Sequence, residues 1–138
     1  MVTAEFLAQT QLFTSLPTTV LEMLAQDFQT RRFRAGEVIF LEGDPGHTLY
    51  LIKQGQVRIF VNGIDGSETS VILCGRPGQL FGELAVIDGL PRSATAVAVV
   101  DTIVYTMDSA IFRHHMDWTF DNINQTQSKL SQFKHLSN

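Results

Sequence analysis

The sequence has a single cysteine, Cys74, among its 138 residues. One cysteine cannot form an internal disulfide or supply a multi-cysteine zinc or iron–sulfur site, so a buried structural thiol is favoured over a reactive one. A long apolar run is also lacking, because the most apolar stretch, residues 94–100, is far too short to span a bilayer. The first residues do not place a basic region before an apolar one, so no signal peptide is predicted. We therefore expect a cytoplasmic protein without membrane contact.

Positive charge is scarce as well. The 10 Lys and Arg residues are outnumbered by 14 Asp and Glu residues, which gives a formal net charge of -4. Nucleic-acid-binding surfaces are usually clustered and basic, so direct nucleic-acid binding is not expected. Hydrophobic residues make up 44% of the chain and charged residues 17%, which is typical of a globular domain and not of a disordered one.

Glycine, in contrast, is frequent in the middle of the chain. All ten glycines lie between residues 36 and 89, and Asn62-Gly63 is a strong turn motif. These and other turn residues separate short apolar or alternating runs at residues 38–41, 48–53, 56–61, 69–74, 95–100 and 103–107. Such runs are typical of a β-sandwich or a β-barrel. The sequence therefore predicts a mainly β fold, a jelly-roll-like β-barrel, over residues 31–107.

Both ends of the chain have helical spacing instead. Residues 18–28 place apolar side chains at helical intervals after Pro17, which suits a first turn. We therefore expect a single domain over residues 1–138. Its barrel is flanked by N-terminal helices within residues 1–30 and by C-terminal helices within residues 108–138.

The C-terminal segment is predicted to be a helix pair. Asp108 is a good N-cap for a short helix that ends at Met116, and either Asp117 or Thr119 caps the next helix. That second helix has a broad apolar face, interrupted by Gln127 and formed by Phe120, Ile123, Leu130 and Phe133. The face packs either on the chain's own barrel or against a second copy, for which it is a weak coiled-coil seam.

One cation is isolated in an apolar region. Between residues 77 and 112 the charged side chains are Glu83, Asp88, Arg92, Asp101 and Asp108, so Arg92 is the only cation there. An arginine in such surroundings is costly unless an anion meets it. Its planar guanidinium suits bidentate contacts with a carboxylate or a phosphate. Glu83 and a bound phosphate are the two candidate anions.

The sequence around Glu83 fits a phosphate. Residues 81–85, Phe-Gly-Glu-Leu-Ala, are predicted to form a glycine turn that opens a short helix, whose first N–H groups favour an anion. The Glu83 carboxylate would repel that anion and is better suited to accept a hydrogen bond from a hydroxyl such as a ribose 2′-OH. Spacing alone leaves two alternatives: a cyclic nucleotide site, or an internal Glu83–Arg92 ion pair in a ligand-free structural or dimerisation module.

Two segments resemble a known family. Residues 81–99, FGELAVIDGLPRSATAVAV, resemble the phosphate-binding cassette of cyclic nucleotide-binding domains. They are similar both to the bacterial cyclic-AMP receptor protein family and to protein kinase A regulatory subunits. Residues 33–60 resemble the first half of the same domain, with Gly36, Gly43 and Gly55 at its turn glycines. The resemblance covers nearly the whole chain and implies a ligand-binding sensor without enzymatic activity.

The resemblance also implies the site residues, within a cassette at residues 81–95. Glu83 resembles the ribose-binding glutamate of the family and Arg92 its phosphate-binding arginine. The other positions match the start of the cassette helix and the pair that follows the arginine. The expected ligand-binding residues are Phe81, Gly82, Glu83, Leu84, Ala85, Arg92, Ser93 and Ala94.

The implied ligand is cyclic AMP, with cyclic GMP as the alternative because Ser93 can donate to a phosphate or to guanine. No other cofactor is expected. In the bacterial relatives, polar residues late in the last helix reach the adenine, and Ser137 and Asn138 match that place. Ligand binding is expected to repack the C-terminal helices through apolar side chains, namely Phe112, Met116, Trp118 and Phe120.

Metal binding and DNA binding are not expected. Only His47 lies in the strand region, whereas a cupin-like metal site needs several converging histidines; His114 and His115 are predicted on a helix surface. The bacterial regulators continue into a helix-turn-helix domain that reads DNA, but this chain ends at Asn138. The expected partners are therefore a cyclic nucleotide, and either a missing effector domain or a second copy bound through the last helix.

Overall fold

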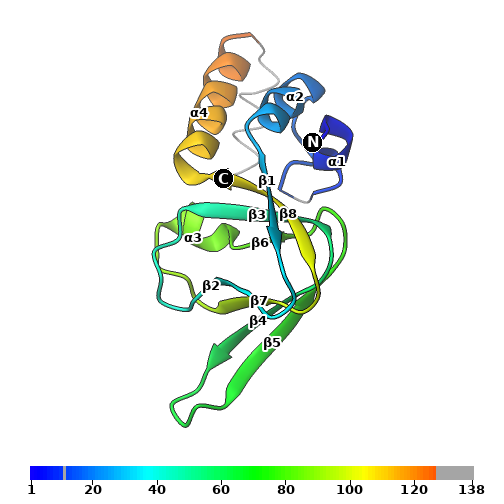
Figure 1. Cartoon of the computed structure of the whole chain (residues 1–138). Coiled ribbons are helices and arrows are strands. Elements are labelled where there is room, and N and C mark those ends of the chain that lie inside the picture. The colour runs from blue at the N-terminus through cyan, green and yellow to red at the C-terminus, as the bar shows by residue number, and fades with distance from the viewer. Residues whose placement is uncertain (11, 127–138) are drawn as a thin grey trace.

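Two antiparallel four-stranded sheets form the centre of this computed structural model, which describes residues 1–10 and 12–126 (Figure 1). One sheet has the order β1 (Gln29–Phe33), β8 (Thr102–Asp108), β3 (Thr48–Gln54) and β6 (Leu80–Phe81). The other has the order β2 (Val38–Phe40), β7 (Thr95–Ala98), β4 (Val57–Asn62) and β5 (Glu68–Cys74). The prediction of a mainly β fold is confirmed, and the strands form a sandwich of two sheets.

Three helices gather at one end of the sandwich, and a fourth lies beside it (Figure 1). The three are α1 (Ala4–Ala8), α2 (Thr18–Gln26) and α4 (Ser109–Thr126), and the fourth is α3 (Glu83–Asp88). Helix α3 contacts β3, and the β4–β5 hairpin extends from the opposite end of the molecule. The predicted placement of helices at both ends of the chain is confirmed.

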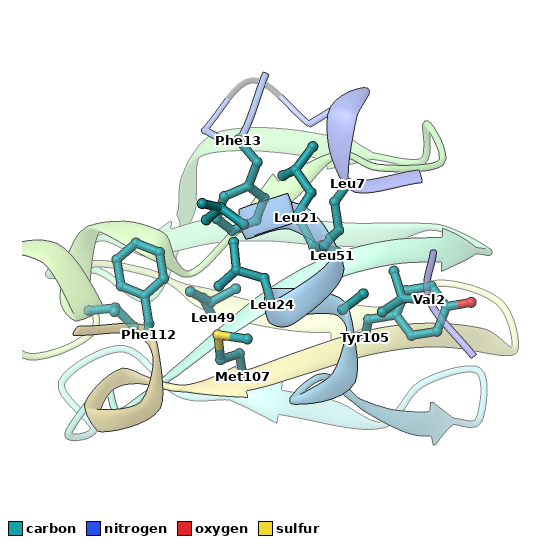
Figure 2. Close-up of a cluster of buried hydrophobic side chains, with 13 residues drawn as sticks. Val2, Leu7, Phe13, Leu21, Leu24, Leu49, Leu51, Tyr105, Met107 and Phe112 are labelled. Atoms are coloured by element: carbon teal, nitrogen blue, oxygen red, sulfur yellow. The ribbon is translucent and has the colours of Figure 1, made fainter. Parts of the chain in front are cut away.

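Strand β3 is buried on both faces and separates two hydrophobic cores. Leu49 and Leu51 point to a core shared with α2, β8 and α4, which Figure 2 shows. Tyr50 and Ile52 point to a second core between the two sheets. Because successive side chains of a strand point to opposite faces, one strand serves both cores. A shift of β3 therefore changes the packing of the terminal helices and the packing between the two sheets.

The predicted strands are confirmed to within a few residues, but the sequence missed two. Strand β1 has the sequence QTRRF, and four of its five residues are exposed, so it lacks the apolar alternation that predicts a strand. Its pairing with β8 over five residue pairs holds it in place. Strand β6 has only two residues, Leu80 and Phe81, which pair with β3. Tertiary pairing, and not local sequence, makes both segments extended.

The predicted break in the C-terminal helix is wrong, because α4 is continuous from Ser109 to Thr126. The Thr119 hydroxyl donates to the carbonyl of His115 one turn earlier, at 2.7 Å, so it is bonded inside the helix and does not cap a new one. The predicted cap at Asp108 is confirmed, since its Oδ1 accepts the Ala110 N–H at 2.8 Å. The expectations for Gln127, Leu130, Phe133, Ser137 and Asn138 lie outside the described residues.

The two adjacent histidines of α4 differ from each other. His114 is exposed as predicted, but His115 is only 7% exposed, so its predicted place on the helix surface is wrong. Its Nε2 lies 2.6 Å from Oδ2 of Asp27, the C-cap residue of α2. This polar contact ties α4 to α2 beside their shared hydrophobic core. Within the described residues, no helix is both long and apolar enough to cross a membrane.

Candidate functional site

The chain turns from β6 into α3 at Gly82. This residue is the N-cap of α3 and has left-handed backbone angles, φ 77° and ψ 4°. A Cβ at Gly82 would also lie 2.7 Å from Nη1 of Arg92. Glycine is therefore needed twice here, for the backbone conformation and for the space that Arg92 occupies.

Arg92 is buried, with 5% of its surface exposed, and its guanidinium is held by backbone carbonyls. Nη1 donates to the carbonyl of Gly82 and Nη2 donates to the carbonyl of Thr48, both at 2.6 Å. These two bonds use two of the five N–H donors of a guanidinium. Nε is buried and has no hydrogen-bond partner among the described residues. A buried donor without a partner is costly, and the arrangement leaves donor capacity for an anion.

Aromatic rings lie against the guanidinium of Arg92. The Arg92 guanidinium lies 4.2 Å from the ring centre of Phe40 and 5.6 Å from that of Tyr50. Tyr50 is in turn stacked on Phe81, with 5.0 Å between ring centres. A guanidinium over aromatic faces is attracted by the ring quadrupoles. The rings therefore hold the plane of the guanidinium without neutralising its charge.

Burial is the main influence on the pKa of Arg92 and lowers it. Tyr50, Asp44 and Glu83 act in the opposite direction. The ordinary pKa of an arginine lies so far above neutrality that Arg92 keeps its proton despite this lowering. The site thus contains a buried positive charge at physiological pH.

Glu83 does not neutralise Arg92. The part of the chain that the structure describes contains two ion pairs, Arg58–Glu68 and His115–Asp27, and neither includes Glu83 or Arg92. The internal ion pair that the sequence left as an alternative is therefore not formed among the described residues.

A cavity of about 450 Å³ opens beside Arg92 and lies within the usual size range of small-molecule sites. Seven of the eight predicted site residues line it: Phe81, Gly82, Glu83, Ala85, Arg92, Ser93 and Ala94. The structure does not describe the side chain of the eighth, Leu84. The cassette thus brings the predicted residues to one cavity, with a carboxylate and a guanidinium in its lining.

The remaining residues that line the cavity were missed by sequence reasoning. They are strand residues and residues of the turn before β6, namely Phe40, Ile59, Val61, Ile72, Cys74, Gln79 and Leu80. Ile59 of β4 and Ile72 of β5 face each other across the hairpin register. Their apolar side chains resemble any other strand residues in the sequence, so only the register of the sheet reveals that they line a site.

Cys74 lines the cavity as a buried thiol, with 3% of its surface exposed. Burial raises its pKa, and the negative charge of Glu83 raises it further, while Arg76 lowers it. The thiolate is the reactive form of cysteine, so this environment keeps Cys74 in its unreactive form. The predicted burial of this thiol is confirmed.

A protein site for a metal ion needs several ligand side chains that converge on one point. Residues 1–10 and 12–126 contain no group of three His, Cys, Asp or Glu side chains arranged to hold a metal ion. His47 is exposed, in the loop before β3.

The fold and the cavity together define a β-sandwich domain with a buried arginine and a carboxylate in the lining of one cavity. Comparison with known families identifies it further: the sequence pattern of the cyclic nucleotide-binding domain matches residues 30–117, more than half of the chain. The chain therefore belongs to the cyclic nucleotide-binding domain family.

Similar proteins come from two groups of regulators. The chain is 43% identical to the cyclic AMP receptor protein of Thermus thermophilus over 66% of its own length and 42% of that protein. It is 33% identical to a cAMP-dependent protein kinase regulatory subunit of Hypocrea atroviridis over 78% of its length and 22% of that protein. The structure of the regulatory domain of Toxoplasma gondii PKA with cAMP superposes with a TM-score of 0.75, at 32% identity, over 80% of this chain and 42% of that one. The chain thus spans less than half of these relatives.

The raised pKa of Cys74 predicts a loss of stability at alkaline pH. The unfolded thiol ionises near its ordinary pKa, about 8.5, while the folded thiol, whose pKa is raised, ionises at a higher pH. Unfolded protein therefore binds fewer protons, and the free energy of unfolding falls as pH rises above that value. Urea unfolding between pH 7 and 10 measures this fall, which is shallower in Cys74→Ala. Identical pH dependence in the two proteins would contradict the assigned environment.

Proposed function

We propose that this chain is a sensor domain that binds cyclic AMP between Glu83 and Arg92. The observation that carries the proposal is the buried guanidinium of Arg92, which faces a cavity and has no carboxylate partner among the described residues. A cyclic phosphodiester carries one negative charge and supplies the missing anion. Membership of the cyclic nucleotide-binding domain family supports the same assignment.

The proposed roles follow from the chemistry of each lining group. Arg92 binds the cyclic phosphate through the N–H donors that its two carbonyl bonds leave over. Glu83 accepts a hydrogen bond from the ribose 2′-OH, and the exposed Ser93 donates to the phosphate. The backbone N–H groups at the start of α3, from Gly82 to Ala85, are proposed as further donors to the phosphate and the ribose, because the first N–H groups of a helix have no partner within it.

The base is proposed to lie against the apolar wall of β4 and β5. Ile59, Val61 and Ile72 give that wall a surface suited to the flat face of a purine. These side chains carry no hydrogen-bonding group, so they recognise a purine without distinguishing adenine from guanine. The preference for cyclic AMP rests on the relatives, one of which is a cyclic AMP receptor protein and one of which was solved with cAMP.

Ligand binding is proposed to reach α4 through α3. Nη2 of Arg113, in the second turn of α4, donates to the carbonyl of Val86 in α3 at 3.2 Å. Phe112 and Met116 pack in the core that α2 and α4 share with β3 and β8. Closure of α3 on a ligand moves the Val86 carbonyl and changes the preferred position of α4. A ligand shifts such an equilibrium when it binds one arrangement more tightly than the other.

The expected sensor residues differ in their surroundings. Phe112 is buried, Met116 is partly buried against the same core, and Trp118 is 40% exposed. The side chain of Phe120 lies outside the described residues. The named relatives are regulatory proteins, and we propose that this chain likewise acts by binding and movement, without catalysis.

Replacing Arg92 with Leu tests the proposed phosphate contact. The variant loses a charge-assisted contact, so its affinity for cyclic AMP is expected to fall at least a hundredfold, or about 3 kcal/mol. Arg92→Lys keeps the charge but loses the fork geometry and is expected to be intermediate. Titration calorimetry measures both, with circular dichroism to check folding. Equal affinity in the wild-type protein and a folded Arg92→Leu variant would show that Arg92 does not bind the phosphate.

Glu83→Gln tests the proposed ribose contact. A neutral amide oxygen accepts a weaker hydrogen bond than a carboxylate, so affinity for cyclic AMP is expected to fall roughly fivefold, or about 1 kcal/mol. The same change leaves binding of 2′-deoxy cyclic AMP nearly unaltered, because that analogue has no 2′-OH. Calorimetry with both nucleotides on both proteins gives a double-mutant cycle. An equal loss of affinity for the two nucleotides would show that Glu83 does not bind the 2′-OH.

Arg113→Met tests the proposed link between α3 and α4. The chain has one tryptophan, Trp118, which lies in α4 and reports on its surroundings by fluorescence. Saturating cyclic AMP is expected to change the Trp118 emission in the wild-type protein, and the change falls to about half or less in Arg113→Met. Arg32→Met, an exposed arginine of β1, is the control and behaves as wild type. An undiminished change in Arg113→Met argues against this link.

A further inference from the structure

We propose that Gly46 is a positioning residue for Arg92, because the absence of a side chain there lets the β2–β3 loop pack directly against α3. This inference rests on the proposed function, since Arg92 is the group that is positioned. Gly46 carries no functional group of its own and contributes only space.

The loop between β2 and β3 holds Arg92 by its main chain. The Gly43 N–H donates to the carbonyl of Arg92, and the Arg92 N–H donates to the carbonyl of Asp44, both at 2.8 Å. At the end of the loop, the carbonyl of Thr48 accepts from Nη2 of Arg92 at 2.6 Å. Three hydrogen bonds thus fix both the backbone and the guanidinium of Arg92 to one short segment. Any displacement of this segment moves the guanidinium with it.

Gly46 lies in the middle of that segment, where there is no room for another carbon. A Cβ at Gly46 would lie 2.3 Å from the Cβ of Ala85 and 3.0 Å from Nε of Arg92. Carbon atoms in contact prefer about 3.5–4.0 Å, and the Ala85 Cβ cannot rotate away because it is fixed to the backbone of α3. The loop and α3 must therefore separate by on the order of 1 Å to admit a methyl group.

Backbone conformation does not explain this glycine. Gly43, in the same loop, has φ 89° and open space around its Cα, so its conformation favours glycine. Gly46 has no positive φ and is restricted only by its neighbours. An alanine at Gly46 is therefore expected to act through its methyl group, which separates the loop from α3 and displaces Arg92.

The expected consequence is a loss of ligand affinity that exceeds any loss of folding. Binding groups act only when they are held within about 0.5 Å of the productive geometry. The displaced loop carries the Thr48 carbonyl with it, so the Arg92 donors no longer point to the place that the phosphate occupies. Removing the Ala85 methyl group at the same time relieves the 2.3 Å contact. The remaining contacts with Nε and Cδ of Arg92, at 3.0 and 3.2 Å, then require a shift of only a few tenths of an ångström, so Arg92 returns close to its position.

The test compares the affinity of four variants for cyclic AMP with that of the wild-type protein. Gly46→Ala is expected to bind at least tenfold more weakly. Gly46→Ala combined with Ala85→Gly recovers to within threefold of Ala85→Gly alone. Gly75→Ala is the control, because its added Cβ meets only ordinary contacts at 3.5 Å or more and its φ is not positive. The inference is overturned if the affinity of Gly46→Ala for cyclic AMP lies within twofold of the wild-type affinity. It is also overturned if the affinity of the double variant does not recover.

A second measurement needs no ligand and separates this inference from the proposed function. The Nε–H of Arg92 is buried, so its NMR signal is expected to exchange slowly with water in the wild-type protein and much faster in Gly46→Ala. If the wild-type protein binds no cyclic nucleotide, the proposed function fails, and this signal alone decides the role of Gly46. An Arg92 signal that is the same in both proteins contradicts that role.

Discussion

A buried arginine without a carboxylate partner is the constraint on which the rest of the site depends. The described structure holds the Arg92 guanidinium with the carbonyls of Gly82 and Thr48 and supports it on aromatic rings, and these groups fix its direction without cancelling its charge. Burying a charge in this way is unfavourable for the apo protein. An anion that binds Arg92 removes this unfavourable burial of an unpaired charge. The free energy that is regained in this way adds to the affinity for the anion.

Strand β3 connects this site to the ends of the molecule. Its first residue, Thr48, gives Arg92 a carbonyl, and Tyr50 stacks on Phe81 at the start of the cassette. The alternate side chains of the same strand, Leu49 and Leu51, pack against the terminal helices. Helix α3 reaches α4 by a second route, the hydrogen bond between Arg113 and Val86. The cavity and the C-terminal helix therefore share a strand and a hydrogen bond, and these are the contacts through which the proposed coupling acts.

Most of the strands could be predicted from the sequence, because glycines and alternating apolar runs mark them. The candidate site could also be predicted, because Glu83 and Arg92 are isolated charges in an apolar segment. The remainder depends on contacts between distant residues. A backbone carbonyl such as that of Thr48 has no sequence signature, and Gly46 looks like any loop glycine until Ala85 is placed beside it. Strand β1 and the buried His115 were missed for the same reason, since pairing with β8 and with Asp27 determines their environments.

Thermal unfolding of the unaltered chain in the presence of cyclic AMP tests the central claim most directly. A ligand that binds only the folded protein raises the melting temperature by mass action, and the rise continues with each tenfold increase in ligand above the dissociation constant. The account predicts such a rise with cyclic AMP, and a smaller one or none with the same concentration of inorganic phosphate or 5′-AMP. A melting temperature that does not change at millimolar cyclic AMP or cyclic GMP would contradict it.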